Sequence, residues 1–420
     1  MKIGIFVYSI KIGAVGGVQQ YAERLIFGLS KYSDFGVVVF CSPENSEHFR
    51  KYLGKAQDKI YTIKSRIKFL KPRVINGILK EIFKNRLVRK NKFLYKITSL
   101  IFYNFLTIPL LRLLGDYKLI LEKEVDVVHF PYPYLQRYDL QIPAIISFHD
   151  LLYKNFPEFF KLKNIEKMEN YFKSSAEVST RIIVSFSHVR YDLVKFYGIQ
   201  ADKIDVCRPG LDIDNNIVEQ KMKKNFERHK IPQDYLIYPA APSPHKNHVR
   251  LIQALDLLHN KYNKKVSLVI TGSKYASDYY YLIEKEIKKF NLENYVVFTD
   301  YISSQEELYA LMKRSLLVVV PALYEAGSGP VDEALIMNIP VIGSEKAGLP
   351  EQIGEKEFMF DPYNIEEMAE KINLMLTDDK IRQRNLDNCK RQAEKIKWEN
   401  SINSFVDCYN KALKDFYKND

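Results

Sequence analysis

The stretch 315–350 most constrains the fold of this chain of 420 residues. It reads SLLVVVPALYEAGSGPVDEALIMNIPVIGSEKAGLP. The apolar run 316–320 has the length and composition of a buried strand. A glycine-containing loop follows. Pro330 then suits the first position of a helix, because the N–H that proline lacks would be unpaired there. We therefore predict a strand, a loop, a helix to about residue 337, and a second strand from Val341.

Two carboxylates on this unit indicate a ligand site. Glu325 lies in the loop past the strand, and Glu333 lies in the first turn of the predicted helix. Between them are Gly327, Ser328 and Gly329. A helix N-terminus favours an anion such as phosphate, and a nearby carboxylate can accept hydrogen bonds from sugar hydroxyls. This combination suggests a sugar nucleotide. The simpler alternative is a surface loop in which only the helix dipole places Glu333.

Repeated strand–helix units predict two doubly wound α/β domains with mainly parallel sheets. Strands of the first series are expected at 3–7, 37–41, 125–130, 144–150 and 181–187, with a short one near 206. Strands of the second series are expected at 236–240, 266–273, 294–303, 316–320, 341–343 and 357–362. The length also fits two domains, and the polar residues from 213 to about 232 are the expected linker. A cleft between two such domains commonly holds a ligand.

The four cysteines are far apart in the sequence and signal neither a disulfide framework nor a zinc site. We expect them to be buried side chains in a reducing compartment. The apolar N-terminal run is interrupted by Lys11 and lacks a small-residue cleavage site, so it reads as a first strand rather than a secretory signal. The expected location is the cytoplasm.

The net charge of +12 is concentrated in one insert, at about residues 60–120. Residues 60–100 contain twelve Lys or Arg and one acid, in a basic and apolar alternation at roughly helical spacing. This pattern favours an amphipathic helix on an anionic membrane surface. The apolar piece 100–114 is too short and too interrupted to span a bilayer. The alternative is a solvated helical face packed on the domain. Nucleic acid is not an expected partner, since no recognised binding module is present.

Two further features come from the first series of units. His149 follows a strand end, where α/β folds place ligands, and could carry a proton, bind a hydroxyl or serve only structure. A loop with Gly16 and Gly17 leads into a helix over 18–30, a weak glycine-turn signal by itself.

Several motifs in order resemble those of one enzyme family. They are GGVQQYAERL (16–25), VSFSHVRYDL (184–193), CRPGLD (207–212), PSPHKNH (242–248), YEAGSGPVDEAL (324–335), GSEKAGLPEQIG (343–354) and FDPYN (360–364). Together they resemble the retaining, nucleotide-sugar-dependent glycosyltransferases of family 4, over almost the whole chain. The resemblance implies the GT-B fold, two Rossmann-like domains facing a cleft. The implied division is an acceptor-side domain at 1–212, a donor-binding domain at 213–394, and a final helix within 395–420 that packs back on the first domain.

The resemblance also implies roles for single residues. Lys246 would balance the donor diphosphate, Glu333 would hold the ribose hydroxyls, and Glu325 would contact the donor sugar near its reacting carbon. His149 would contact that sugar from the N-terminal side. The remaining implied residues offer backbone groups: Gly327, Ser328 and Gly329 to the sugar and phosphate, and Gly16 and Gly17 to the diphosphate and acceptor.

One position departs from the family pattern. Many members carry an arginine five residues before the lysine, where this chain has Ala241. One expected cation is therefore missing, unless Arg208 or another residue replaces it. We expect no cofactor and no metal, with the sugar moving to a lipid-linked or membrane-associated glycan. The alternatives are a GT-B nucleotide-sugar epimerase and a weakly catalytic scaffold subunit of a glycan assembly complex.

Overall fold

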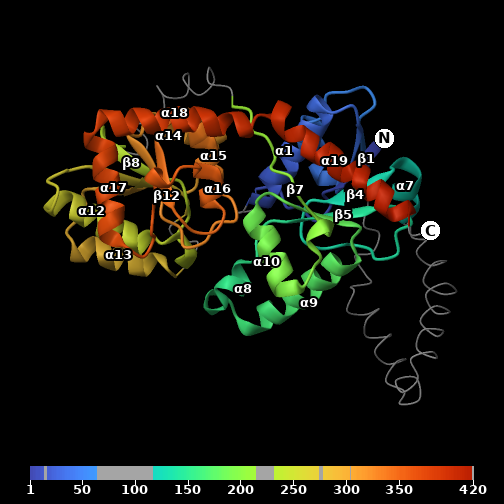
Figure 1. The fold of residues 1–420 in the computed structure, drawn as a ribbon, viewed down its shortest axis with the longest axis horizontal. Helices are drawn as coiled ribbons and strands as arrows, with labels where there is room; N and C mark the ends of the chain where they lie inside the picture. Colours follow the sequence, from blue (N-terminus) through green and yellow to red (C-terminus); the bar gives the residue numbers. More distant parts are fainter. Residues whose placement is uncertain (14–16, 64–116, 214–230, 274–277, 303, 419–420) are drawn as a thin grey trace, which may run out of the picture.

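The chain forms two parallel α/β sheets that lie side by side (Figure 1). A computed structural model describes residues 1–13, 17–63, 117–213, 231–273, 278–302 and 304–418. We call the first sheet with its helices the N-terminal domain, and the second the C-terminal domain. Two separate apolar cores support the two sheets. The predicted fold class, two doubly wound parallel α/β domains, is confirmed.

The first sheet has seven strands, all parallel to their neighbours. Their order is β3 (Lys59–Thr62), β2 (Gly36–Cys41), β1 (Lys2–Phe6), β4 (Val127–Phe130), β5 (Ala144–Phe148), β6 (Arg181–Val184) and β7 (Ile204–Val206). The helices are α1 (Gly17–Tyr32), α2 (Ser46–Arg50), α7 (Tyr117–Glu124), α8 (Leu152–Asn155), α9 (Leu162–Val178) and α10 (Ser187–Tyr197). The central strands are continuous apolar runs because helices cover both faces of the sheet.

The second sheet has six parallel strands. Their order is β10 (Val296–Phe298), β9 (Ser267–Ile270), β8 (Tyr235–Tyr238), β11 (Leu317–Val320), β12 (Val341–Ser344) and β13 (Met359–Phe360). The helices are α12 (His248–Asn260), α13 (Tyr280–Lys289), α14 (Gln305–Arg314), α15 (Gly329–Ile336), α16 (Leu349–Ile353), α17 (Ile365–Thr377) and α18 (Asp379–Lys395).

The last helix, α19 (Trp398–Tyr417), returns to the N-terminal domain. Figure 1 shows α18 along the C-terminal domain and α19 continuing across the other one. The bend lies at Ile396 and Lys397, just before Trp398. The Trp398 ring fills space that only glycine leaves open, because a Cβ atom at Gly28 of α1 or at Gly210 would overlap it.

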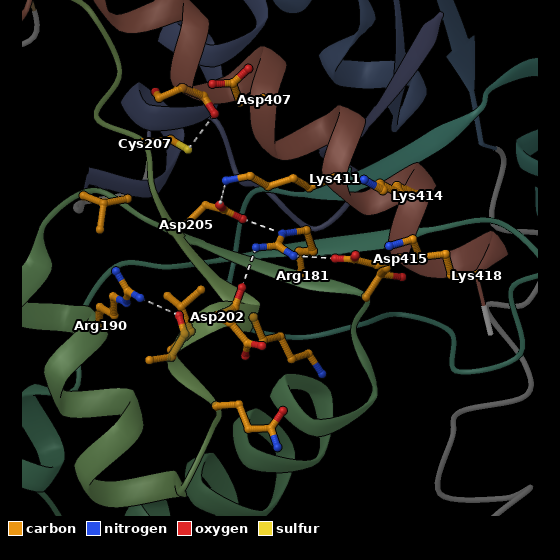
Figure 2. A pocket seen from close by; sticks show the side chains of 17 residues that line it. Arg181, Arg190, Asp202, Asp205, Cys207, Asp407, Lys411, Lys414, Asp415 and Lys418 are labelled. Carbon is orange, nitrogen blue, oxygen red and sulfur yellow. Dashed lines mark hydrogen bonds and ion pairs between the residues drawn. The ribbon is translucent and has the colours of Figure 1, made fainter.

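Arg181 fastens α19 to the edge of the first sheet. Its guanidinium pairs with Asp205 of β7 and with Asp415 of α19, and it donates to the backbone oxygen of Asp202 at 2.6 Å (Figure 2). An open pocket of about 1030 Å³ lies beside these residues. It contains none of the predicted site residues. Lys411 also pairs with Asp205, so these ion pairs join β6, β7 and α19, and we assign them a structural role.

The predicted basic insert has different edges in the structure. Residues 59–62 form β3, which pairs with β2, and residues 117–124 form α7. β3 was not predicted from the sequence, and its four residues include no fully buried side chain. Residues 64–116, which carry the membrane prediction, lie outside the described residues, as do linker residues 214–230. No helix within the described ranges is long and apolar enough to cross a membrane.

Candidate functional site

The strand order of the second sheet has a switch point between two loops. β8 and β11 are neighbours, but the chain leaves β8 toward β9 and leaves β11 toward β12, on the opposite side. Parallel sheets bind ligands at such a switch point, beyond the carboxyl ends of the strands. The loop after β8 contains Lys246, and the loop after β11 contains Glu325. These two predicted residues, 79 positions apart, therefore meet at one edge of the sheet.

Lys246 and Glu325 form an ion pair. Their side chains are 23% and 12% exposed, so a ligand at the switch point could reach both. Their loops are joined by the backbone as well, because the Leu323 N–H donates to the His245 carbonyl at 2.8 Å. The ammonium group is thus held where it could exchange a carboxylate partner for a phosphate. Phosphate accepts charge-assisted hydrogen bonds equally well.

Asn247, next to Lys246, holds this loop in place and was not predicted. Its backbone has a left-handed φ of 61°, a conformation that asparagine tolerates better than most residues. Its buried side-chain amide donates to the carbonyls of Pro321 at 2.9 Å and Pro362 at 2.8 Å. One side chain therefore ties together the loops after three strands. The HKN motif contained it, but nothing in the sequence identified the two distant acceptors.

Glu333 is buried at the start of α15. Its Oε1 accepts from Gln305 Nε2 at 3.0 Å and lies 3.7 Å from Arg24 Nη2 of the N-terminal domain. Its Oε2 is buried without a hydrogen-bond partner among the described residues. Because α15 begins at Gly329, Glu333 lies in the second turn, and the first-turn prediction was wrong by one residue. Asp332 occupies the first turn instead.

The pKa of the Glu333 carboxyl is raised to about 7 by burial, with Asp332 adding to the shift and Arg24 and Gln305 opposing it. An unpaired buried acceptor is costly, so Oε2 is a position where a ligand hydroxyl would be stabilised. Arg24 lies within the quoted motif GGVQQYAERL and Gln305 within no quoted motif, and neither was predicted to contact Glu333. Only the approach of α1 and α14 to α15 identifies them.

The glycine loop meets the other domain closely. A Cβ atom at Gly327 would overlap the ring of Phe186 from the N-terminal domain. The Ser328 N–H donates to Gln352 Oε1 at 2.7 Å, and Gln352 Nε2 returns a bond to the Ser328 carbonyl at 3.0 Å. The Ser328 N–H, which was predicted to donate to a ligand, therefore donates to a side chain of the protein instead. Gly329 is the first residue of α15, where an N–H group has no intrahelical acceptor, so its N–H is the better candidate for a ligand.

Arg208, the candidate replacement for the arginine missing at Ala241, has a carboxylate partner within the protein. Its guanidinium pairs with Asp332 of α15 and lies 4.9 Å from the centroid of the Phe186 ring. It therefore joins the two domains at the N-terminus of α15. Ala241 packs closely against Gly272, where a Cβ would come within 2.8 Å of the Ala241 Cα.

His149 follows β5 in the N-terminal domain. Its Nε2 lies 3.0 Å from the Pro131 carbonyl, which can only accept, so Nε2 carries the hydrogen. Burial lowers the pKa of His149 and keeps the ring neutral at pH 7. Nδ1 is then an acceptor, and the ring suits a substrate hydroxyl better than proton donation. Its ring packs edge-on against Tyr21 of α1, with 4.6 Å between centroids.

Of the two predicted glycines in the acceptor-side loop, one belongs to the described residues. Gly17 begins α1 and is exposed, whereas Gly16 lies outside the described residues. Within the described part of the chain, no group of three or more His, Cys, Asp or Glu side chains could hold a metal ion.

Two protein families match the chain, one for each domain. Residues 15–215 match Glycosyltransferase Family 4, and residues 220–396 match Glycosyl transferases group 1. Among curated relatives, the O-antigen chain mannosyltransferase RfbU of Salmonella typhimurium is 23% identical over 341 residues, 80% of each chain. O-antigen chain mannosyltransferase B of Escherichia coli is 23% identical over 63% of this chain and 70% of its own. The chain spans only 32% of the longer Escherichia coli mannosyltransferase WbdA, at 21% identity.

Solved structures share the fold at low sequence identity. Sucrose-phosphate synthase from Thermosynechococcus elongatus superposes with a TM-score of 0.67 at 15% identity, covering 98% of this chain and 99% of its own. Anabaena HepE, in complex with UDP and glucose, gives 0.65 at 16% identity, covering 98% of this chain and all of its own.

Proposed function

Because the chain belongs to the group 1 glycosyltransferases of family 4, we propose that it moves a hexose from a nucleoside-diphosphate sugar to a cell-surface glycan, with retention of configuration. The observation that carries this proposal is the meeting of Lys246 and Glu325 at the sheet switch point, beside the buried free oxygen of Glu333. A cation for phosphate and a carboxylate for a diol are the two groups that a sugar nucleotide requires.

In the proposed reaction, the bond between the sugar C1 and the diphosphate oxygen breaks, and a bond from C1 to an acceptor hydroxyl oxygen forms. The electron pair of the broken bond leaves with the nucleoside diphosphate. The proton of the acceptor hydroxyl is lost, to the departing phosphate oxygen if attack is front-side. Negative charge therefore grows on the leaving group, where Lys246 and the Gly329 N–H would stabilise it. No metal is required by this arrangement.

The donor sugar would lie between the two domains. Glu333 would accept from the ribose hydroxyls through its free Oε2. Glu325, released from Lys246 by the diphosphate, would be beside the reacting carbon, and His149 Nδ1 would accept from a sugar hydroxyl on the other side. A short-lived glycosyl intermediate on a carboxylate is the competing route to retention.

Mannose is the first sugar to test, because RfbU and mannosyltransferase B are named for mannose transfer to O-antigen chains. The UDP complexes of HepE make uridine nucleotides the second choice. We place the acceptor at the cytoplasmic face of a membrane, on a lipid-linked or membrane-associated glycan. The basic insert would hold the enzyme there.

A panel of nucleotide sugars tests this function. Binding and release of nucleoside diphosphate would be measured with UDP-, GDP- and dTDP-linked hexoses, GDP-mannose included, with and without lipid-linked glycan extract. We expect one donor to bind, to be hydrolysed slowly, and to be consumed faster when the extract is present. Conversion of the donor to its epimer would favour the epimerase alternative. Binding of no donor would refute the transferase.

A further inference from the structure

Tyr324, the residue before Glu325, extends out of the C-terminal domain into the other one. Its side chain is 4% exposed. The hydroxyl accepts from the backbone N–H of Leu151 at 3.2 Å and donates to Asp192 Oδ2 at 3.0 Å. Both partners belong to the N-terminal domain. Neither the glycine-loop motif nor the spacing of the two glutamates requires such a contact.

The receiving pocket is built around a buried carboxylate. Asp192 of α10 is 1% exposed, and its Oδ2 also accepts from Asn155 Nδ2 at 2.8 Å. The Tyr324 ring packs edge-on against His188, with 5.1 Å between centroids, and against Phe156 at 6.2 Å. A buried carboxylate is costly unless hydrogen bonds satisfy it. One of its donors comes from the opposite domain, so the pocket is complete only when the domains are together.

The hydrogen bonds of Tyr324 connect the two sides of the candidate site by very short paths. Tyr324 is joined to Glu325 by one peptide bond. Leu151 lies two residues after His149, on the same loop. A shift of the C-terminal domain that kept the other contacts but lost this one would therefore move Glu325 relative to His149. A displacement of about 1 Å can cost a hundredfold in rate.

We propose that Tyr324 is a positioning residue. When the domains close, it fixes the position of Glu325 relative to His149, on opposite sides of the donor sugar. This inference rests on the proposed function, because it assigns the donor sugar to the space between those two residues. Other contacts between the domains do not do this. Glu351 of α16, for example, accepts from the Ser187 and His188 N–H groups at 3.0 Å each. It reaches the Glu325 loop only through the N-terminus of α16, where the Gly348 N–H donates to the Glu325 carbonyl at 2.8 Å, and it contacts α10 rather than the loop with His149.

The test is a Tyr324→Phe variant, which keeps the ring and removes only the hydroxyl. Tyr235→Phe is the matched control, because it removes a buried hydroxyl that bonds the Leu311 carbonyl at 2.7 Å inside the C-terminal domain. We expect Tyr324→Phe to lower kcat for transfer about tenfold to a hundredfold. Donor Kd should stay within about twofold, since Lys246 and Glu333, the residues proposed to hold the nucleotide, are both on the C-terminal domain. The control should keep kcat within about threefold.

Two further measurements separate positioning from simple stabilisation. Asp192→Ala should also lower kcat, and the losses in the double variant should be less than additive, because the two changes share the bond between Tyr324 and Asp192. Asp192→Asn keeps an acceptor oxygen and should retain most of the activity. Hydrogen exchange of the peptide containing Leu151 should be faster in Tyr324→Phe than in wild type, because its N–H loses its acceptor.

Wild-type kcat in Tyr324→Phe, or a loss of donor affinity equal to the loss of kcat, would overturn the positioning role. Unchanged exchange at Leu151 would overturn the contact itself, and this measurement needs no enzymatic activity. By contrast, a wild-type protein that binds no nucleotide sugar would refute the proposed function, and with it the catalytic meaning of this contact.

Discussion

Arg24 of α1 and Glu333 of α15 form an ion pair between the two domains, with 3.7 Å between Nη2 and Oε1. The Glu333 side chain is 3% exposed and the Arg24 side chain 20%. A buried carboxylate in the donor-side domain thus receives its cation from the opposite domain. The domains therefore contribute jointly to the ionisation state of the residue proposed to bind ribose.

Removing this cation should weaken donor binding at neutral pH. In Arg24→Gln, the pKa of Glu333 should rise further, because Arg24 opposes the effect of burial. At pH 7 the carboxyl would then be mostly protonated, and donor affinity should fall about threefold to tenfold by titration calorimetry. Lys31→Gln is the control, since Lys31 lies on the same helix and pairs with Asp212 at the surface. Equal losses in the two variants would contradict the pairing.

Donor affinity should depend on pH through Glu333. The pKa of about 7 means that the carboxylate, the better acceptor for hydroxyls, prevails above pH 7. Affinity for an intact nucleotide sugar should therefore rise between about pH 6 and 8 and then level off. In Glu333→Gln this rise should be absent, and in Arg24→Gln it should move to higher pH. A wild-type affinity that is flat over this range would exclude Glu333 as the titrating group.

The raised pKa of Glu333 has the opposite consequence for stability: the rise in pH that favours donor binding lowers the free energy of unfolding. Since the folded pKa of Glu333 lies above its ordinary value of 4.5, its contribution to folding is greatest below pH 4.5 and is lost as pH rises through 7. A bound donor would offset this loss.

Lys246→Ala should lower kcat by about a hundredfold to a thousandfold, because a preorganised charge aimed at the leaving group is lost. Steady-state release of nucleoside diphosphate measures this. Lys261→Ala serves as control, since this lysine follows α12 and pairs with Glu366 at the surface. Turnover of the Lys246 variant at the wild-type rate would exclude the phosphate assignment.

Gly28→Ala should loosen α19. The added Cβ would overlap the ring of Trp398, so the helix must shift, at a cost of about 1–3 kcal/mol. Trp398 is the single tryptophan of the chain and is buried, so its emission should move to longer wavelength as the first thermal transition falls. Gly54→Ala adds the same atom where the nearest contact would be 3.8 Å away, and should leave both unchanged.

The membrane proposal is tested by four charges in the insert. Replacing Lys84, Arg86, Arg89 and Lys90 by Gln should weaken pelleting with anionic vesicles by about 1 kcal/mol per charge. The control replaces four exposed lysines of the C-terminal domain, namely Lys264, Lys265, Lys285 and Lys288. If both variants pellet like wild type, the insert does not hold the protein on the vesicles.

The sequence by itself determined the two series of strands and helices, and most predicted strands lie within a few residues of the observed ones. Periodicity and apolar runs are local properties, which explains this success. The motifs also placed Lys246, Glu325 and Glu333 on loops and a helix that meet at one sheet edge. The strand at 59–62 was missed because an exposed edge strand carries no buried apolar run.

Only the tertiary structure decided which groups remain available to a ligand. The Ser328 N–H is taken by Gln352, whereas Glu333 Oε2 has no hydrogen-bond partner in the part of the chain that the structure describes. It also supplied Arg24 and Tyr324, whose partners lie in the opposite domain. The physical reason is that a hydrogen bond or ion pair depends on distances of a few ångströms. When the partners are more than a hundred positions apart, the docking of two domains sets those distances, and no local pattern records them.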